Sequence, residues 1–517
     1  MSKQFQCDET GPIVQTKQGK LRGFVVDGTY TFHGVQYATA RRFHAPQPVR
    51  PWKGVRNALA YGYVCPLLRQ DEPSNEVMIP HRYWPMDENC QYLNIWTQSV
   101  DKSAQKPVMV WLHGGGFFAG SSIEQVAYDG ESLSRYGDVV VVSLNHRLNV
   151  LGYLDLSPFG EEYANSANAG TDDMIAALQW IRENIAAFGG DPENVTLFGQ
   201  SGGGMKVWTL MQTPAADGLF HKGIVQSGVI AHFMEDTGED GTAIVTALLE
   251  ELHLKKAKQL ETVPYPLLAQ AYLKVCPALE AQGHYVGGNP KPNAYFVGDP
   301  LKVGFREHAK TIPVLIGTVL GEFSFMPALP RSVKKDSQKV VALMEKRYGA
   351  HAGEIQALFA AAYPEKEGSD ALFVDSLFRA PTMEFIEKKA RCPESATYSY
   401  LFSYNFPYDG GHIAWHCSEI PFVFHNTALV PVCNDGKTSD RLEQQLSDAW
   451  LNFARTGNPN AANLPNWPAC QPGDEACMLF DKTCRLAHNH DHALIALHAA
   501  ITPAFGQEAE EEQQIQH

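Results

Sequence analysis

The sequence lacks a long apolar run, an excess of positive charge and any C-x-x-C pair of cysteines. No stretch of about 18 apolar residues occurs, and the first residues do not resemble a secretory signal, so we expect a cytoplasmic protein without a membrane span. With 42 basic against 57 acidic residues the net charge is −15, which disfavours nucleic acid and anionic membranes as partners. Ten cysteines in 517 residues, none in a C-x-x-C pair, exclude a disulfide scaffold and argue against a structural zinc site.

The chain is long enough to bury a sizeable core, and no internal repeat or long linker divides it. We therefore predict a single domain over residues 1–505. Residues 506–517 are rich in Glu and Gln and have almost nothing to bury, which predicts a disordered acidic tail. Two further stretches, residues 231–310 and 326–395, are expected to be helical insertions that form cap or regulatory regions over the active site.

Short apolar runs alternate with a helical pattern in the middle of the chain. Residues 108–112 and 139–144 are continuous apolar runs, typical of strands that are buried on both faces. Apolar residues then recur at three- and four-residue spacing over residues 172–185, which predicts a helix, and residues 194–199 predict another strand. Strands that alternate with helices indicate an α/β fold with a large, mostly parallel central sheet flanked by helices.

Ser201 stands in a G-x-S-x-G motif formed by residues 199–203. The motif follows a predicted strand and precedes a predicted helix, and so sharp a turn needs small neighbours that leave the serine hydroxyl exposed. A serine in this position is a candidate nucleophile for acyl transfer. The alternative is an ordinary turn, since glycine and serine are common in loops. The strand before the motif favours the nucleophile.

A second glycine-rich segment, residues 113–117 (HGGGF), directly follows a predicted strand. Consecutive glycines can turn backbone N–H groups toward one point, where acyl transfer needs donors for the developing negative oxygen. Together with Ser201, the segment predicts an oxyanion hole made by the N–H groups of Gly115, Gly116 and Gly202. Without such a serine, the same glycines would indicate only a flexible turn.

Residues 188–203, with the sequence FGGDPENVTLFGQSGG, resemble the serine signature of type-B carboxylesterases, the cholinesterase-like branch of the α/β-hydrolases. Residues 88–96 (ENCQYLNIW) are similar to the second signature of that family and differ from it at Asn89 and Gln91. Further matching segments follow in family order, so the resemblance extends from about residue 11 to about residue 480. It implies the α/β-hydrolase fold and a bacterial carboxylesterase of the para-nitrobenzyl-esterase kind.

The resemblance also implies the other two members of a catalytic triad. Residues 313–322 are similar to the family segment in which a strand leads into the catalytic glutamate, which assigns that role to Glu322. Residues 416–424 (HCSEIPFVF) resemble the family's histidine loop, which assigns the general base to His416. The order Ser201, Glu322, His416 is the nucleophile, acid, histidine order of α/β-hydrolases.

Other polar residues lie near these positions or are implied beside them. His412, four residues before His416, is its chief competitor, whereas His425 follows the apolar run instead of preceding it. The resemblance also places Ser227 near the histidine and glutamate as a supporting hydroxyl. The alternative for Ser227 is a serine that simply ends a strand.

The surroundings of the predicted nucleophile bear on the substrate. Gln200 stands where many relatives carry a glutamate, and without that negative charge a cationic, choline-type substrate gains less stabilisation, so we favour neutral esters. Cys65 and Cys90 resemble a pair that is bridged in secreted relatives, and in a reducing cytosol we expect thiols. Five aromatic side chains are candidates for the lining of a substrate gorge, with burial in the core as the alternative: Trp84, Phe117, Phe118, Phe323 and Phe325.

These features predict a serine carboxylic ester hydrolase that acts through an acyl-enzyme on Ser201 and needs no metal or organic cofactor. The expected substrates are small-molecule esters that are neutral and either small to medium in size or aromatic, and the expected assembly is a monomer or a weak homo-oligomer. Two alternatives remain: an amidase or thioesterase that uses the same triad, and a non-catalytic cholinesterase-like binding module. The serine at position 201 and the lack of a secretory start argue against the binding module, while the triad does not separate esters from amides.

Overall fold

The computed structural model describes residues 4–69, 81–231, 233, 238–324, 334, 337–407 and 411–502. Phe325 and the predicted tail at residues 506–517 lie outside these ranges. The chain divides into two compact units, one formed by Met1–Ile224 and Met234–Ile312 and the other by Val225–Phe233 and Pro313–His517. One domain over residues 1–505 stays a prediction. No helix of the described ranges combines the length and apolar character that a membrane crossing needs.

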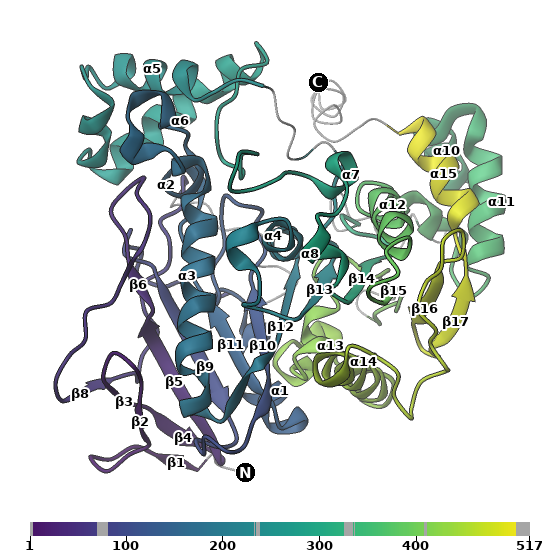
Figure 1. Cartoon of the computed structure of the whole chain (residues 1–517). Coiled ribbons are helices and arrows are strands. Elements are labelled where there is room, and N and C mark those ends of the chain that lie inside the picture. The colour runs from purple at the N-terminus through teal and green to yellow at the C-terminus, as the bar shows by residue number, and fades with distance from the viewer. Residues whose placement is uncertain are drawn as a thin grey trace. The chain divides into compact units, whose positions relative to one another are not determined.

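The first unit is built on a mixed sheet in which β10 pairs in parallel with β11 on one side and β12 on the other (Figure 1). The three strands predicted at residues 108–112, 139–144 and 194–199 are all present. Their central residues are buried because apolar side chains cover both faces. In sheet order the strands are β1 (Phe5–Gln6), β4 (Phe24–Val26), β5 (Thr29–Gln36), β9 (Tyr92–Thr97), β11 (Val140–Leu144), β10 (Lys106–Leu112) and β12 (Gly190–Gln200).

Two smaller sheets complete the strands of this unit. They consist of β2 (Ile13–Gln15), β3 (Lys20–Arg22) and β8 (Val55–Asn57), and of β6 (Ala38–Thr39) with β7 (Gln47–Pro48). β13 (Lys222–Gln226) contains the point at which the chain leaves the first unit.

The helix predicted at residues 172–185 is α3, whose apolar residues, including Met174, Leu178 and Ile181, are buried. Both α3 and α4 lie in front of the strands in Figure 1 and contact each other. Part of the predicted insertion at residues 231–310 forms α5 and α6, which pack on each other and on α2 around Leu268. The α-helices of the unit are α1 (Glu131–Gly137), α2 (Asn149–Tyr153), α3 (Ala169–Asn184), α4 (Gly202–Met211), α5 (Thr242–Glu251), α6 (Tyr265–Glu280), α7 (Pro300–Val303) and α8 (Glu307–Lys310).

The second unit contains the parallel strands β14 (Val314–Val319), β15 (Thr397–Phe402) and β16 (Ala476–Phe480), with β17 (Arg485–His488) antiparallel at the edge. All residues of β14, β15 and β16 are buried. The α-helices of this unit are α10 (Ser337–Tyr348), α11 (Ala352–Ala362), α12 (Arg379–Ala390), α13 (Ile420–Val423), α14 (Lys437–Thr456) and α15 (His492–Ile501).

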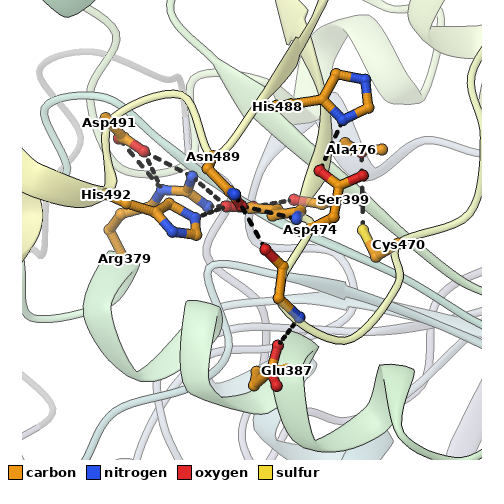
Figure 2. Close-up of polar contacts among 12 residues, drawn as sticks. Arg379, Glu387, Ser399, Cys470, Asp474, Ala476, His488, Asn489, Asp491 and His492 are labelled. Atoms are coloured by element: carbon orange, nitrogen blue, oxygen red, sulfur yellow. Dashed lines mark hydrogen bonds and ion pairs between the residues drawn. The ribbon is translucent and has the colours of Figure 1, made fainter.

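A buried ion network ties α12 to the strands of the second unit (Figure 2). The guanidinium of Arg379 donates to both carboxylate oxygens of Glu475, at 2.8 and 2.9 Å, and to Oδ1 of Asp491 at 2.7 Å. His492 adds a contact of 2.7 Å to Glu475. Although burial alone would raise it, the charge of Arg379 holds the pKa of the Glu475 carboxyl far below its usual value.

Candidate active site

Ser201 lies at the sharp turn between β12 and α4 that the G-x-S-x-G motif predicts. Its backbone has φ 58° and ψ −126°, a strained conformation for a residue with a side chain. The flanking glycines make room for the turn, since a Cβ on Gly199 would lie 2.5 Å from the carbonyl carbon of Gly203 and a Cβ on Gly203 would lie 2.0 Å from the carbonyl oxygen of Leu112. Ser201 is partly exposed, whereas Gln200 before it is fully buried.

The glycine loop packs directly on this turn. A Cβ on Gly202 would lie 2.3 Å from both the backbone nitrogen and the backbone oxygen of Gly116, so the two backbones touch. Gly115 and Gly116 have φ values of 81° and 59°, in the left-handed region that favours glycine. Among the described residues, no hydrogen bond uses the N–H groups of Gly115, Gly116 and Gly202. Three donors on adjoining backbone segments are thus available to a ligand oxygen.

Glu322 and His416 form a hydrogen-bonded pair in the second unit. Glu322 is fully buried, and its Oε2 lies 2.5 Å from Nδ1 of His416. Its Oε1 accepts hydrogen bonds from the hydroxyl of Ser227 at 2.7 Å and from the backbone N–H of Val319 at 3.0 Å. These donors hold the carboxylate in one orientation. A proton on Nδ1 of the neutral ring leaves the lone pair on Nε2, the nitrogen that a general base would use.

Aromatic side chains pack against the His416 ring. The centroid of the His416 ring lies 5.1 Å from that of Phe323 and 5.0 Å from that of Phe378. The backbone N–H of His416 donates to the carbonyl of Glu322 at 2.5 Å. The His416 side chain keeps 11% of its surface exposed. The imidazole is therefore restrained in orientation and still open to a reaction partner.

The competing histidines make other contacts. Nδ1 of His412 lies 2.8 Å from the carbonyl oxygen of Ile413, and its ring packs edge to face on Trp415. Nδ1 of His425 lies 3.3 Å from the hydroxyl of Ser447, beside α14. The hydrogen bond to the buried Glu322 thus distinguishes His416 from both.

Two carboxyl groups near Glu322, the fully buried Glu419 and the half-buried Asp375, were not predicted from the sequence. Burial, reinforced by the negative charge of Glu322, raises the pKa of Glu419 to about 7 and that of Asp375 to about 7. Glu419 accepts a hydrogen bond from the Gln226 amide at 3.1 Å, and Asp375 accepts from backbone N–H groups at the start of α12. Glu419 directly precedes the apolar run at residues 420–424, and this position could have suggested it from the sequence. No sequence pattern marks Asp375.

The four described aromatic candidates for the substrate lining differ in exposure. Phe118 and Phe323 expose 37% and 39% of their surface, respectively. Phe117 is fully buried, with its ring packed edge to face on Tyr153, which places it in the core. Trp84 packs on Tyr61 and donates to its carbonyl at 3.3 Å. A substrate lining formed by any of them stays a prediction.

The first unit thus brings together Ser201, Gly115, Gly116 and Gly202, and the second unit brings together Glu322, His416 and Ser227. Each group is assembled from segments far apart in the sequence. Within the described ranges, no cluster of three or more His, Cys, Asp or Glu side chains is suited to a metal ion. Cys65 and Cys90 are buried free thiols.

The profile of the Carboxylesterase family matches residues 10–495. The chain belongs to this family. It is 33% identical to the para-nitrobenzyl esterase of Bacillus subtilis, with 91% of this chain and 95% of that protein covered. It is 34% identical to the phenmedipham hydrolase of Pseudarthrobacter oxydans, with the same two coverages. The resemblance to type-B carboxylesterases is confirmed.

The carboxylesterase is also similar to solved structures of esterases. It is 52% identical, with a TM-score of 0.94, to an esterase from anaerobic Clostridium hathewayi described as able to hydrolyse aliphatic aromatic polyesters, over 97% of this chain and 100% of that one. A carboxylesterase of Geobacillus stearothermophilus is 30% identical with a TM-score of 0.71, over 94% and 99%. The α/β-hydrolase fold is confirmed, and the protein is a serine carboxylic ester hydrolase.

Proposed function

We propose that Ser201 is the nucleophile of this carboxylesterase, His416 its general base and Glu322 the carboxylate that orients His416. In the first step His416 takes the proton of Ser201 as the hydroxyl attacks the ester carbonyl, and the alcohol leaves with that proton. Water, activated by the same histidine, then releases the acid from the acyl-enzyme. The backbone N–H groups of Gly115, Gly116 and Gly202 would stabilise the negative oxygen of both tetrahedral intermediates. Ser227 would support the carboxylate through its bond to Glu322.

The hydrogen bond from His416 to the buried Glu322 is the observation that carries this proposal. A serine hydroxyl is inert at neutral pH without a base, and a histidine can act as one only if its tautomer and orientation are set. Glu322 sets both for His416, and the strained turn presents Ser201 at the start of α4. The proposal requires that the two groups of residues meet in the working enzyme.

We further propose that the substrates are neutral esters, small to medium in size or aromatic. Gln200 supplies no charge beside the proposed nucleophile, so the site gains little from a cationic alcohol group. The names of the related proteins refer to a para-nitrobenzyl ester and to aliphatic aromatic polyesters, both with an aromatic part, which supports the aromatic class. We also propose a cytoplasmic, monomeric or weakly self-associating enzyme with no nucleic acid or membrane partner, which cell fractionation and light scattering would test.

Single substitutions test the triad. Ser201→Ala and His416→Ala should each lower kcat for a 4-nitrophenyl ester by about 10⁴-fold or more, because each removes an obligatory part of one proton-transfer unit. The matched control is His412→Ala, which should keep most of the activity. A crippled His412→Ala enzyme beside an active His416→Ala enzyme would show that the base is misassigned. Hydrolysis of a matched anilide faster than of the ester would instead favour the amidase alternative.

A further inference from the structure

Lys206 is a fully buried lysine in α4, one turn after Gly203. Residues three apart lie on the same face of a helix, so Lys206 lies on the face where Gly203 approaches the carbonyl oxygen of Leu112. Its Nζ donates to the carbonyl oxygen of His113 at 2.8 Å, directly before the glycine loop. A fully buried position of α4 thus holds an amine that reaches the start of this loop.

The burial of Lys206 is compensated only in part, by one hydrogen bond and by the Phe117 ring, whose centroid lies 5.9 Å from Nζ. In the described part of the chain, His113 provides the one acceptor for its Nζ, and no carboxylate lies within ion-pair distance. Burial lowers the pKa of the Lys206 amine to about 7, against the more distant attraction of the Glu124 carboxylate. A buried amine that lacks a carboxylate partner is destabilising relative to an apolar side chain of the same size. Local conflicts of this kind are expected where a residue serves function.

The glycine loop is held by contacts along its backbone and at both of its ends. Residues 114–116 carry no side chains, so their conformation depends on backbone contacts and on anchors at the two ends of the loop. Within the loop, the N–H groups of Phe118 and Ala119 donate to the Gly115 carbonyl at 3.2 and 3.0 Å. At the far end the Phe117 carbonyl accepts from the Asn149 N–H at 2.8 Å, and the Phe117 ring is buried. At the near end the His113 ring stacks on His146 with 5.2 Å between centroids, and its carbonyl is held by Lys206.

The hydrogen bond from Lys206 to the His113 carbonyl sets the orientation of the peptide unit between His113 and Gly114, the first of the glycine loop. The carbonyl of His113 and the N–H of Gly114 belong to one planar unit, so a donor on the carbonyl fixes the rotation of that unit. The N–H groups of Gly115 and Gly116 lie on the next two units, and their effect on a developing oxyanion depends on sub-ångström placement.

We propose that Lys206 is a positioning residue that holds the oxyanion loop in its active shape through the carbonyl of His113. The inference rests on the proposed function of the loop, and it adds a residue that lies outside the catalytic triad. Because Lys206 would act through backbone placement, its loss should affect the stabilisation of the oxyanion more than the binding of the ester.

The test compares Lys206→Met with the wild-type protein and with Lys222→Met. Lys206→Met keeps the length of the side chain and removes the donor, and should lower kcat for a neutral 4-nitrophenyl ester about 30-fold with KM within about threefold. A trifluoromethyl ketone, which forms an oxyanion on the nucleophile, should lose affinity by a similar factor. Lys222 is also a buried lysine of the first unit and bonds Asn194, so Lys222→Met controls for loss of a buried amine and should keep the wild-type kcat.

A covalent probe separates failure of this inference from failure of the proposed function. A 4-nitrophenyl phosphonate should label Ser201 in the wild-type protein, and label on another residue would overturn the proposed function. With label on Ser201, equal phosphonylation rates for wild type and Lys206→Met would overturn only the role of Lys206, as would a rise in KM with unchanged kcat.

A second variant keeps the test decisive if Lys206→Met yields no soluble protein. Lys206→Gln retains an N–H donor on a shorter side chain, so kcat should fall by about threefold to tenfold with little change in KM. A kcat equal to that of the wild type would contradict the proposal. Amide hydrogen exchange of the peptide around residues 113–120 should be faster in either variant than in Lys222→Met.

Discussion

At the scale of single residues, two features of the site are costly by themselves: the strained backbone of Ser201 and the buried charge of Glu322. The strained backbone of Ser201 is tolerated because Gly199 and Gly203 leave room for the turn. The carboxylate of Glu322 is buried yet has donors on both oxygens, so its desolvation is offset. Such residues have few tolerated replacements, and their substitution should affect catalysis before it affects folding.

Gln200 offers a residue-scale test of substrate charge. Gln200→Glu places a carboxylate directly before the proposed nucleophile and should raise kcat/KM for a choline ester relative to its uncharged dimethylbutyl isostere by about fivefold, because an anion attracts the cationic group. The ratio of the two kcat/KM values at low salt is the measurement. A ratio unchanged from the wild type would contradict the argument that Gln200 contributes to a preference for neutral esters.

At the scale of secondary structure elements, β10 and α4 meet without space between them. A Cβ on Gly203 would lie 2.0 Å from the carbonyl oxygen of Leu112, a backbone atom that cannot move away without its strand. In contrast, a Cβ on Gly353, at the start of α11, would meet no atom within 4 Å. Glycine is therefore required at position 203 by the close contact with β10, whereas no steric contact requires it at position 353, although both residues lie in helices.

Gly203→Ala and Gly353→Ala form a matched pair. Gly203→Ala should lower the melting temperature by about 5 °C or more and abolish most activity, since the helix must shift away from the strand. Gly353→Ala should leave activity unchanged and raise stability slightly, because alanine loses less backbone entropy in a helix. Calorimetry of both variants is the measurement, and equal melting temperatures would refute the steric argument.

At the scale of the whole molecule, buried charge links stability to pH. The pKa of Glu475 lies below its unfolded value because of Arg379, so the unfolded state binds more protons in acid. The stability from this pair is complete above about pH 5. It starts to fall as the pH drops through the unfolded pKa of about 4 and is lost only when the pH falls through the much lower folded pKa.

Arg379→Met tests this network. The substitution leaves Glu475 and Asp491 buried without their cation, and should cost about 3 kcal/mol of unfolding free energy at pH 7. Burial then raises the pKa values of the two carboxyl groups, so the folded variant takes up protons as the pH is lowered. The loss of unfolding free energy relative to the wild type should therefore shrink between pH 7 and pH 5. Arg391→Met, which removes an exposed ion pair with Glu387, should change stability by less than about 1 kcal/mol at either pH. A deficit that grows toward pH 5 would contradict the assignment.

The sequence by itself determined the α/β architecture, the turn at Ser201 and the glycine loop before Phe117. These features follow from local physics, since apolar runs, helical spacing and glycines act over a few residues. The assignments of Glu322 and His416 instead needed resemblance to a family, because no local pattern separates His416 from His412.

Only the tertiary structure decided which distant groups become partners. It pairs His416 with Glu322 and Ser227, buries Phe117, and places Lys206 against the His113 carbonyl. The raised pKa values of Glu419 and Asp375 likewise depend on burial beside Glu322. Burial, electrostatic shifts and hydrogen bonds across long sequence separations arise when the chain packs, so composition and spacing alone do not specify them.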